Sequence, residues 1–163
     1  MIAMTGDPRP EIGMRPFERS LPMALMRARE SSMRIFRPML ADHGLTEQQW
    51  RVLRALGEHP DGLEIGELAD VTYLLGPSLS RILVNLEDRG IVTRSKVAHD
   101  ARRSNMSLAD PGFALVRTVA PLSEHLYRSI ENQFGIDRLA ELLNLLDDLA
   151  ANTSVEPHEE AAS

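Results

Sequence analysis

The most constraining feature of the chain is a helix-length segment followed at once by a short basic hairpin, within residues 76–103. The helical segment reads GPSLSRILVNLEDRG, with apolar residues at a spacing of three to four. Two β-like stretches follow, IVTRS and SNMSL, separated by the polar loop KVAHDARR. This order is the layout of a winged helix-turn-helix, in which the helix enters the major groove of DNA and the hairpin reaches the adjacent minor groove. The sequence therefore predicts a mainly α fold with a small β-hairpin that binds duplex DNA.

Helical patterns flank this module on both sides. An apolar stripe predicts a first helix from Ser20 to about residue 43, and Thr46 with Gln49 forms a capping-box signature that opens a second helix. A short helix is expected over residues 64–71. In the helix of the module, Gly76 is expected as the N-cap, Pro77 in the first turn and Gly90 as the C-terminal stop. Two more helices are expected over 110–134 and 136–150. The first and last helices are too apolar to need only one partner surface, which suggests a helical dimerisation layer.

The predicted domain organisation follows these patterns. Residues 1–18 are expected to form a flexible arm, and residues 151–163 a disordered acidic tail. One domain is expected over 19–150, with the winged helix-turn-helix at about 46–109 and dimerisation helices at about 19–43 and 110–150. Pro38 and Pro121 are expected to kink or bend the helices that contain them.

The formal net charge of -6 does not exclude DNA binding, because the charge is unevenly distributed. Residues 78–106 hold six Arg or Lys against three Asp or Glu, a local excess of three positive charges. From Glu131 onward, eight acidic residues face Arg138 alone. Cysteine is absent, so disulfides and thiolate zinc sites are excluded. Without a membrane-length apolar run or a secretory signal pattern at the N-terminus, we expect a cytoplasmic protein with no membrane contact.

Residues on the module carry the candidate DNA contacts. Hydroxyls near a helix N-terminus can donate to phosphate, and Arg81 and Asn85 can pair with guanine and adenine edges. In the hairpin, Asp100 could orient Arg102 for insertion into a narrow minor groove. The alternative is a solvated helix face followed by a generic charged hairpin. The basic hairpin directly after the helix favours DNA.

Other chemistry has little support. The five histidines show no metal-ligand spacing, and no phosphate-binding loop or nucleophile elbow occurs, so we expect no metal, no cofactor and no enzymatic activity. Trp50 is expected in the core, although it could also line a ligand pocket. An arginine of the first helix, such as Arg27, could pair with a carboxylate ligand together with His43.

The segments LTEQQWRVLRAL, GPSLSRILVNLEDRGIVTRS and DARRSNMSL, in this order, resemble the MarR (multiple antibiotic resistance regulator) family of bacterial transcription factors. The resemblance covers residues 21–149. The stretches PMALMRARE and FRPML are further similar to the branch that represses homoprotocatechuate (4-hydroxyphenylacetate) catabolic operons. That branch usually has Arg at the position of Gly76, and family members usually have Thr at the position of Ala109, so Asp110 is expected to cap the long helix instead.

The resemblance implies a homodimer with paired winged helices on a palindromic operator, and release of repression by a small aromatic acid or its thioester. It places Pro77 and Ser78 at the start of the recognition helix. The alternatives are a regulator of efflux or stress genes and a winged-helix protein-interaction module that does not bind DNA. The predicted DNA-contacting residues are Pro77, Ser78, Ser80, Arg81, Asn85, Arg94, Lys96, Asp100, Arg102 and Arg103, and the candidate ligand-binding residues are Arg27, His43 and Trp50.

Overall fold

A computed structural model describes residues 13–97 and 100–153, without the side chains of residues 97 and 100–103. Within this part, a small antiparallel sheet with strand order β1-β3-β2 lies among six α-helices. The predicted fold class, mainly α with a β-hairpin, is confirmed. The elements in chain order are the 3-10 helix Phe17–Arg19, α1 (Leu21–Asp42), α2 (Glu47–Gly57), β1 (Leu63–Glu64), α3 (Ile65–Thr72), α4 (Gly76–Asp88), β2 (Val92–Val97), β3 (Asp100–Leu108), α5 (Asp110–Phe134) and α6 (Ile136–Asn152).

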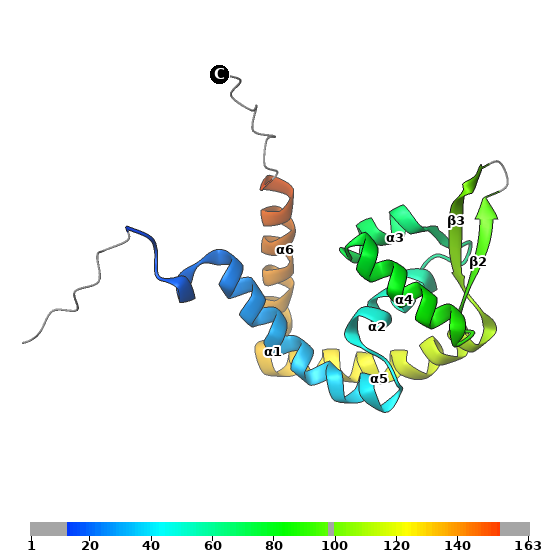
Figure 1. Ribbon diagram of the computed structural model, residues 1–163. Coiled ribbons are helices and arrows are strands. Elements are labelled where there is room, and N and C mark those ends of the chain that lie inside the picture. The colour runs from blue at the N-terminus through cyan, green and yellow to red at the C-terminus, as the bar shows by residue number, and fades with distance from the viewer. Residues whose placement is uncertain (1–12, 98–99, 154–163) are drawn as a thin grey trace, which may run out of the picture.

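The chain forms two regions. The winged-helix lobe comprises α2, α3, α4 and the sheet, and the helical layer comprises α1, α5 and α6. Helix α5 contacts α1 and α2, so it joins the layer to the lobe. Figure 1 shows α6 rising from the end of α5, on the side away from the lobe. No described helix is both long and apolar enough to cross a lipid bilayer.

The hydrophobic core lies mainly in the lobe. The apolar stripe of α4 faces inward, as its spacing predicts, and α2 contributes a second stripe that includes Trp50. Met106 of β3 is fully buried beneath these helices. Burial of this apolar surface holds α4 in a fixed orientation and leaves its opposite side to solvent. The buried residues of the two stripes are Trp50, Val52, Leu53, Leu56, Leu79, Ile82, Leu83 and Leu86.

The predicted capping box at the start of α2 is confirmed. The backbone N–H of Gln49 donates to Thr46 Oγ1 over 3.1 Å, and the backbone N–H of Thr46 donates to Gln49 Oε1 over 2.9 Å. The helix expected from residue 64 instead begins at Ile65, because Leu63 and Glu64 pair with β3 as a short strand. Gly62 permits this pairing, since it has a φ of 83° and a Cβ there would lie 2.5 Å from the Met106 carbonyl oxygen.

Two predicted helix caps are wrong. Leu75, and not Gly76, is the N-cap of α4, and Gly76 is already helical. At α5 the N-cap is Ala109, without a side-chain cap hydrogen bond, and Asp110 lies in the first turn, where its charge favours the positive end of the helix dipole. The predicted stop at Gly90 is consistent with the left-handed φ of 66° just after α4.

The hairpin also differs in detail from the prediction. Helices α1 and α5 contain Pro38 and Pro121 in their interiors, and the bends expected there stay predictions. The strands of the hairpin are longer than IVTRS and SNMSL, since β2 reaches Val97 and β3 starts at Asp100. Most of the segment predicted as a loop therefore belongs to the hairpin, because strand pairing continues to Val97 and Asp100 after an irregularity at Lys96.

Candidate DNA-binding face and ligand cavity

The outward face of α4 carries the residues that the sequence assigns to DNA contact. Ser80, Arg81 and Asn85 are exposed, with Val84 beside them, while Ser78 is half-buried. Pro77 is exposed in the first turn of the helix. Because the other face of α4 is packed into the core, these side chains lie together on one surface of the lobe. Their contact with DNA stays a prediction.

Arg94 has a partner within the protein. Its Nε and Nη2 atoms donate to the Glu87 carboxylate, and the shortest of these bonds measures 2.7 Å. The hydrogen bonds from Glu87, together with its negative charge, raise the pKa of Arg94 above its usual value. This pair joins β2 to the second half of α4. Arg94 therefore has a structural role in orienting the hairpin against α4, and its predicted DNA contact is untested.

The remaining candidate residues of the hairpin belong to its two strands. Lys96 is exposed on β2. Asp100, Arg102 and Arg103 belong to β3, but their side chains lie outside the described part of the structure. The predicted pairing of Asp100 with Arg102 and the minor-groove contact of the arginines stay predictions.

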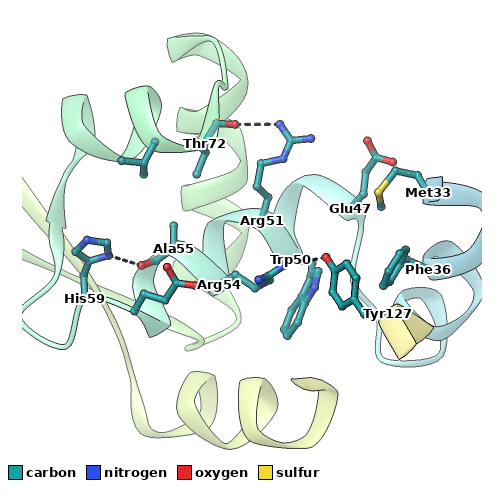
Figure 2. A pocket seen from close by; sticks show the side chains of 12 residues that line it. Met33, Phe36, Glu47, Trp50, Arg51, Arg54, Ala55, His59, Thr72 and Tyr127 are labelled. Atoms are coloured by element: carbon teal, nitrogen blue, oxygen red, sulfur yellow. Dashed lines mark hydrogen bonds between the residues drawn. The ribbon is translucent and has the colours of Figure 1, made fainter. Parts of the chain in front are cut away.

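A cavity of about 450 Å³ opens between the helical layer and the lobe, a volume typical of small-molecule sites. Its wall combines Met33 and Phe36 of α1, Trp50 of α2 and Tyr127 of α5 (Figure 2). The rings of Phe36 and Tyr127 pack with their centroids 4.8 Å apart. Such a wall suits a flat apolar ring, because aromatic groups pack favourably in offset or tilted arrangements.

Two arginines of α2 lie at this cavity, and both donate to neutral oxygen atoms. Arg51 Nη1 donates to the Thr72 carbonyl oxygen over 2.9 Å, and Arg54 Nη1 donates to the Tyr127 hydroxyl over 3.0 Å (Figure 2). No ion pair among the described residues engages either guanidinium. His59 also lines the cavity, with its Nδ1 2.7 Å from the Ala55 carbonyl oxygen. The cavity can therefore pair an apolar ring with a carboxylate.

Glu47 at the edge of the cavity belongs to an ion-pair network with α1. It binds the guanidiniums of Arg29 and Arg37, and Arg37 also binds Glu30 over 2.7 Å. Partial burial by itself raises the pKa of the Glu47 carboxyl, but the hydrogen bonds and charges of Arg29 and Arg37 outweigh burial and lower the pKa. Glu47 is therefore paired with arginines of α1, whereas Glu58, which also lines the cavity, has no ion pair among the described residues.

Of the three candidate ligand-binding residues, the structure brings Trp50 alone to this cavity. Trp50 is 6% exposed, so it belongs to the core and lines the cavity at once. Arg27 donates instead to the Glu18 carbonyl oxygen over 3.4 Å, and His43 lies at the end of α1 with Nδ1 2.8 Å from the Met39 carbonyl oxygen. Neither lines the cavity, and their ligand-binding roles stay predictions.

Sequence reasoning did not identify Arg51, Arg54, Phe36 or Tyr127. A signal existed for Arg54, which follows Trp50 by four residues and so shares its side of α2. Tyr127 is 73 residues from Arg54 in the chain, and no local pattern joins the two.

Comparisons with known proteins agree with this geometry. A sequence model of the MarR family matches residues 43–103. The chain is 41% identical, over 81% of its length and 88% of the relative, to the homoprotocatechuate degradative operon repressor of Escherichia coli. It is similar to the crystal structure of NadR in complex with 4-hydroxyphenylacetate, with a TM-score of 0.73 and 34% identity over 86% of this chain and 99% of that one. It is also similar to the transcriptional repressor CouR bound to a 23-mer DNA duplex, with a TM-score of 0.74 and 28% identity over 84% and 98% of the two chains.

Proposed function

This chain belongs to the MarR family, and we propose that it is a dimeric DNA-binding repressor of an aromatic-acid catabolic operon. A small aromatic carboxylate, bound in the cavity between layer and lobe, releases it from DNA. The observation that carries the ligand class is a cavity with an aromatic wall and two arginines whose described partners are neutral oxygens. In this proposal the protein acts in the cytoplasm and is not an enzyme.

Support for DNA binding comes from the exposed face of α4 and the basic hairpin beside it. The hydroxyl and guanidinium groups of Ser80 and Arg81 face outward together. Residues 78–106 carry an excess of positive charge in an otherwise acidic chain, so the local field attracts phosphate despite the net charge of -6. The similarity to an operon repressor and to a DNA-bound repressor supports the same role.

Support for a homodimer comes from apolar side chains that the single chain leaves exposed. On α6, Leu143 and Leu145 are 53% and 58% exposed, and the first half of α1 exposes Leu21 and Met26. A second copy would cover these side chains and stabilise the dimer by burying apolar surface. Two-fold symmetry would then present two α4 helices to successive major grooves, which requires a palindromic operator.

The position of the cavity supports the mechanism of release. Its walls come from α1 and α5 of the layer and from α2 and α3 of the lobe. A ligand that contacts both regions favours one relative orientation of layer and lobe. If that orientation moves the two recognition helices away from the spacing of the grooves, the dimer loses affinity for its operator.

The test begins with duplexes selected from a random-sequence pool by the purified full chain. We expect a palindrome, bound with an affinity that falls steeply as salt rises, and about tenfold weaker binding or more when 4-hydroxyphenylacetate or homoprotocatechuate is added. Binding that is absent or insensitive to salt contradicts the DNA-binding role.

The variant Arg54→Met tests the ligand site, and Arg128→Met on the exposed surface of α5 is the control. Loss of a charge-assisted hydrogen bond should weaken 4-hydroxyphenylacetate binding by about tenfold or more while operator binding without ligand is retained. The control should respond to the ligand like the wild type. An unchanged ligand response in Arg54→Met shows that the carboxylate does not bind at this arginine.

A further inference from the structure

Gln49 on α2 contacts Asn85 on the outward face of α4. We propose that Gln49 is a positioning residue that fixes which end of the Asn85 amide faces DNA. The inference rests on the proposed DNA-binding role of α4 and adds a determinant of what that helix can read.

The capping box decides the orientation of the Gln49 amide. A backbone N–H can only donate, so the Gln49 atom that lies 2.9 Å from the Thr46 nitrogen must be the carbonyl oxygen Oε1. The second hydrogen bond of the box, from the Gln49 backbone N–H to Thr46 Oγ1, holds the same turn in place. Gln49 must therefore direct Nε2, its donor end, away from Thr46.

The orientation of Gln49 determines that of Asn85 in turn. Gln49 Nε2 lies 2.8 Å from the Asn85 side chain, and since Nε2 donates, the Asn85 atom that it meets is the acceptor Oδ1. The amide nitrogen Nδ2, with two N–H groups, is then the end left for the outward surface that includes Ser80 and Arg81. Among the described residues, Nδ2 has no hydrogen-bond partner in the protein.

This orientation makes Asn85 a donor toward DNA. In the major groove, the acceptors are N7 and O6 of guanine, N7 of adenine and O4 of thymine, whereas the donors are N4 of cytosine and N6 of adenine. An asparagine with both ends free can bind adenine through two hydrogen bonds, but here Oδ1 is turned toward Gln49 of α2 instead of the outward surface. Asn85 should therefore favour a base edge rich in acceptors, or a phosphate oxygen, over cytosine.

The variant Gln49→Glu reverses the amide while keeping the cap. A glutamate oxygen still accepts from the Thr46 N–H, as in the usual capping box, but its other oxygen cannot donate. Asn85 must then turn Nδ2 toward residue 49 and Oδ1 toward DNA. We expect operator affinity to fall about fivefold per half-site. Preference at the base pair that Asn85 reads should shift toward cytosine or adenine, with little change in Tm.

The control is Gln48→Glu, which adds the same charge at the neighbouring exposed position. A double-mutant cycle with Asn85→Ala separates charge from orientation. In the Asn85→Ala background, the effect of Gln49→Glu should shrink to that of Gln48→Glu. Anisotropy titrations of the selected duplex, and of single base-pair variants of it, measure both quantities. If Asn85 donates to a phosphate, Gln49→Glu lowers the affinity for all of these duplexes equally. Such a uniform loss, when it depends on Asn85, also supports the proposed orientation of the Asn85 amide.

Additive effects of Gln49→Glu and Asn85→Ala, with no change in base preference, would overturn the inference while leaving the DNA-binding role intact. A wild-type protein that binds no duplex overturns the DNA-binding role and this inference with it. Asn85→Asp provides a second variant that does not alter α2. Like Asn85→Ala it cannot donate outward, and its carboxylate also adds an acceptor and a negative charge toward DNA, so it should bind more weakly than Asn85→Ala. Equal or tighter binding by Asn85→Asp also counts against the assignment.

Discussion

Helices α4 and α6 carry similar apolar stripes, yet they differ in what covers them. In α4, every leucine and the isoleucine of the stripe is buried against α2, α3 and the sheet. Helix α6 contains six leucines and has no buried residue, although it contacts α5. Apolar periodicity therefore identifies a face that needs a partner without saying whether the partner belongs to the same chain. The lobe is complete in one copy, whereas the helical layer, as we propose, requires a second.

The largest effect should come from separating the two copies. The double variant Leu143→Asp/Leu146→Asp places charges on the apolar side of α6, and we expect it to sediment as a monomer. Its operator affinity should fall about 10²- to 10⁴-fold, because a monomer binds one half-site where the dimer binds two linked half-sites. Asn144→Asp on the same helix is the control and should stay dimeric. A stable dimer in the double variant would show that α6 is not the interface.

A core substitution in the lobe should act on folding of one copy. Leu83 is fully buried on α4, and Leu83→Ala leaves a cavity that should lower the free energy of unfolding by about 2–5 kcal/mol. Chemical denaturation at several protein concentrations measures it. The loss should be the same at each concentration, whereas the α6 double variant should remove the concentration dependence of the wild type. A Leu83→Ala penalty below about 1 kcal/mol would contradict the packing of the lobe.

The hairpin should contribute a smaller, local effect. Arg102→Ala removes one guanidinium that is predicted to enter the minor groove. Operator affinity should fall about tenfold, because one contact with the groove or a phosphate is lost. The dimer should remain intact. Arg128→Ala on α5 serves as the matched loss of charge. The operator affinities of both variants are measured across a range of salt concentrations. Equal affinities of Arg102→Ala and Arg128→Ala would show that Arg102 does not contact DNA.

The smallest effect concerns the junction between layer and lobe. The lowered pKa of Glu47 means that its ion pairs stabilise the fold at pH values above its unfolded pKa of about 4.3, and that this contribution is lost as pH falls through the lower folded value. Glu47→Gln should cost about 1 kcal/mol near pH 7 and almost nothing at about pH 3. Unfolding of both proteins across this pH range measures the difference, and a penalty independent of pH would contradict the role of the ion pairs.

Local patterns predicted most of the fold. The capping box at Thr46, the stripe of α4 and the left-handed stop at Gly90 each depend on neighbours within a few residues, so the sequence contains the whole signal. Apart from the two helix caps, each misplaced by one residue, the errors lie where a distant segment intervenes. Strand β1 exists because residue 63 pairs with residue 106, and no sequence pattern near residue 63 predicts that pairing.

The candidate sites divide in the same way. The outward residues of α4 follow from the helical period, and the sequence selected Arg81 and Asn85 correctly as exposed. The cavity could not be predicted, because it joins α1, α2, α3 and α5, and its arginines depend on partners such as Tyr127 and Thr72 for their positions. Arg27 lies on α1 and His43 at its end, but neither residue lines the cavity.

By itself, the sequence determined the order of the helices, the winged-helix layout and the basic segment within an acidic chain, because each depends on local spacing and charge. Only the tertiary structure decided which polar ends face outward. Arg94 is paired with Glu87, and Asn85 is held by Gln49, which lies 36 residues away. Helical periodicity fixes the side of the helix on which a side chain lies, whereas hydrogen bonds to distant residues fix the direction of its donors and acceptors.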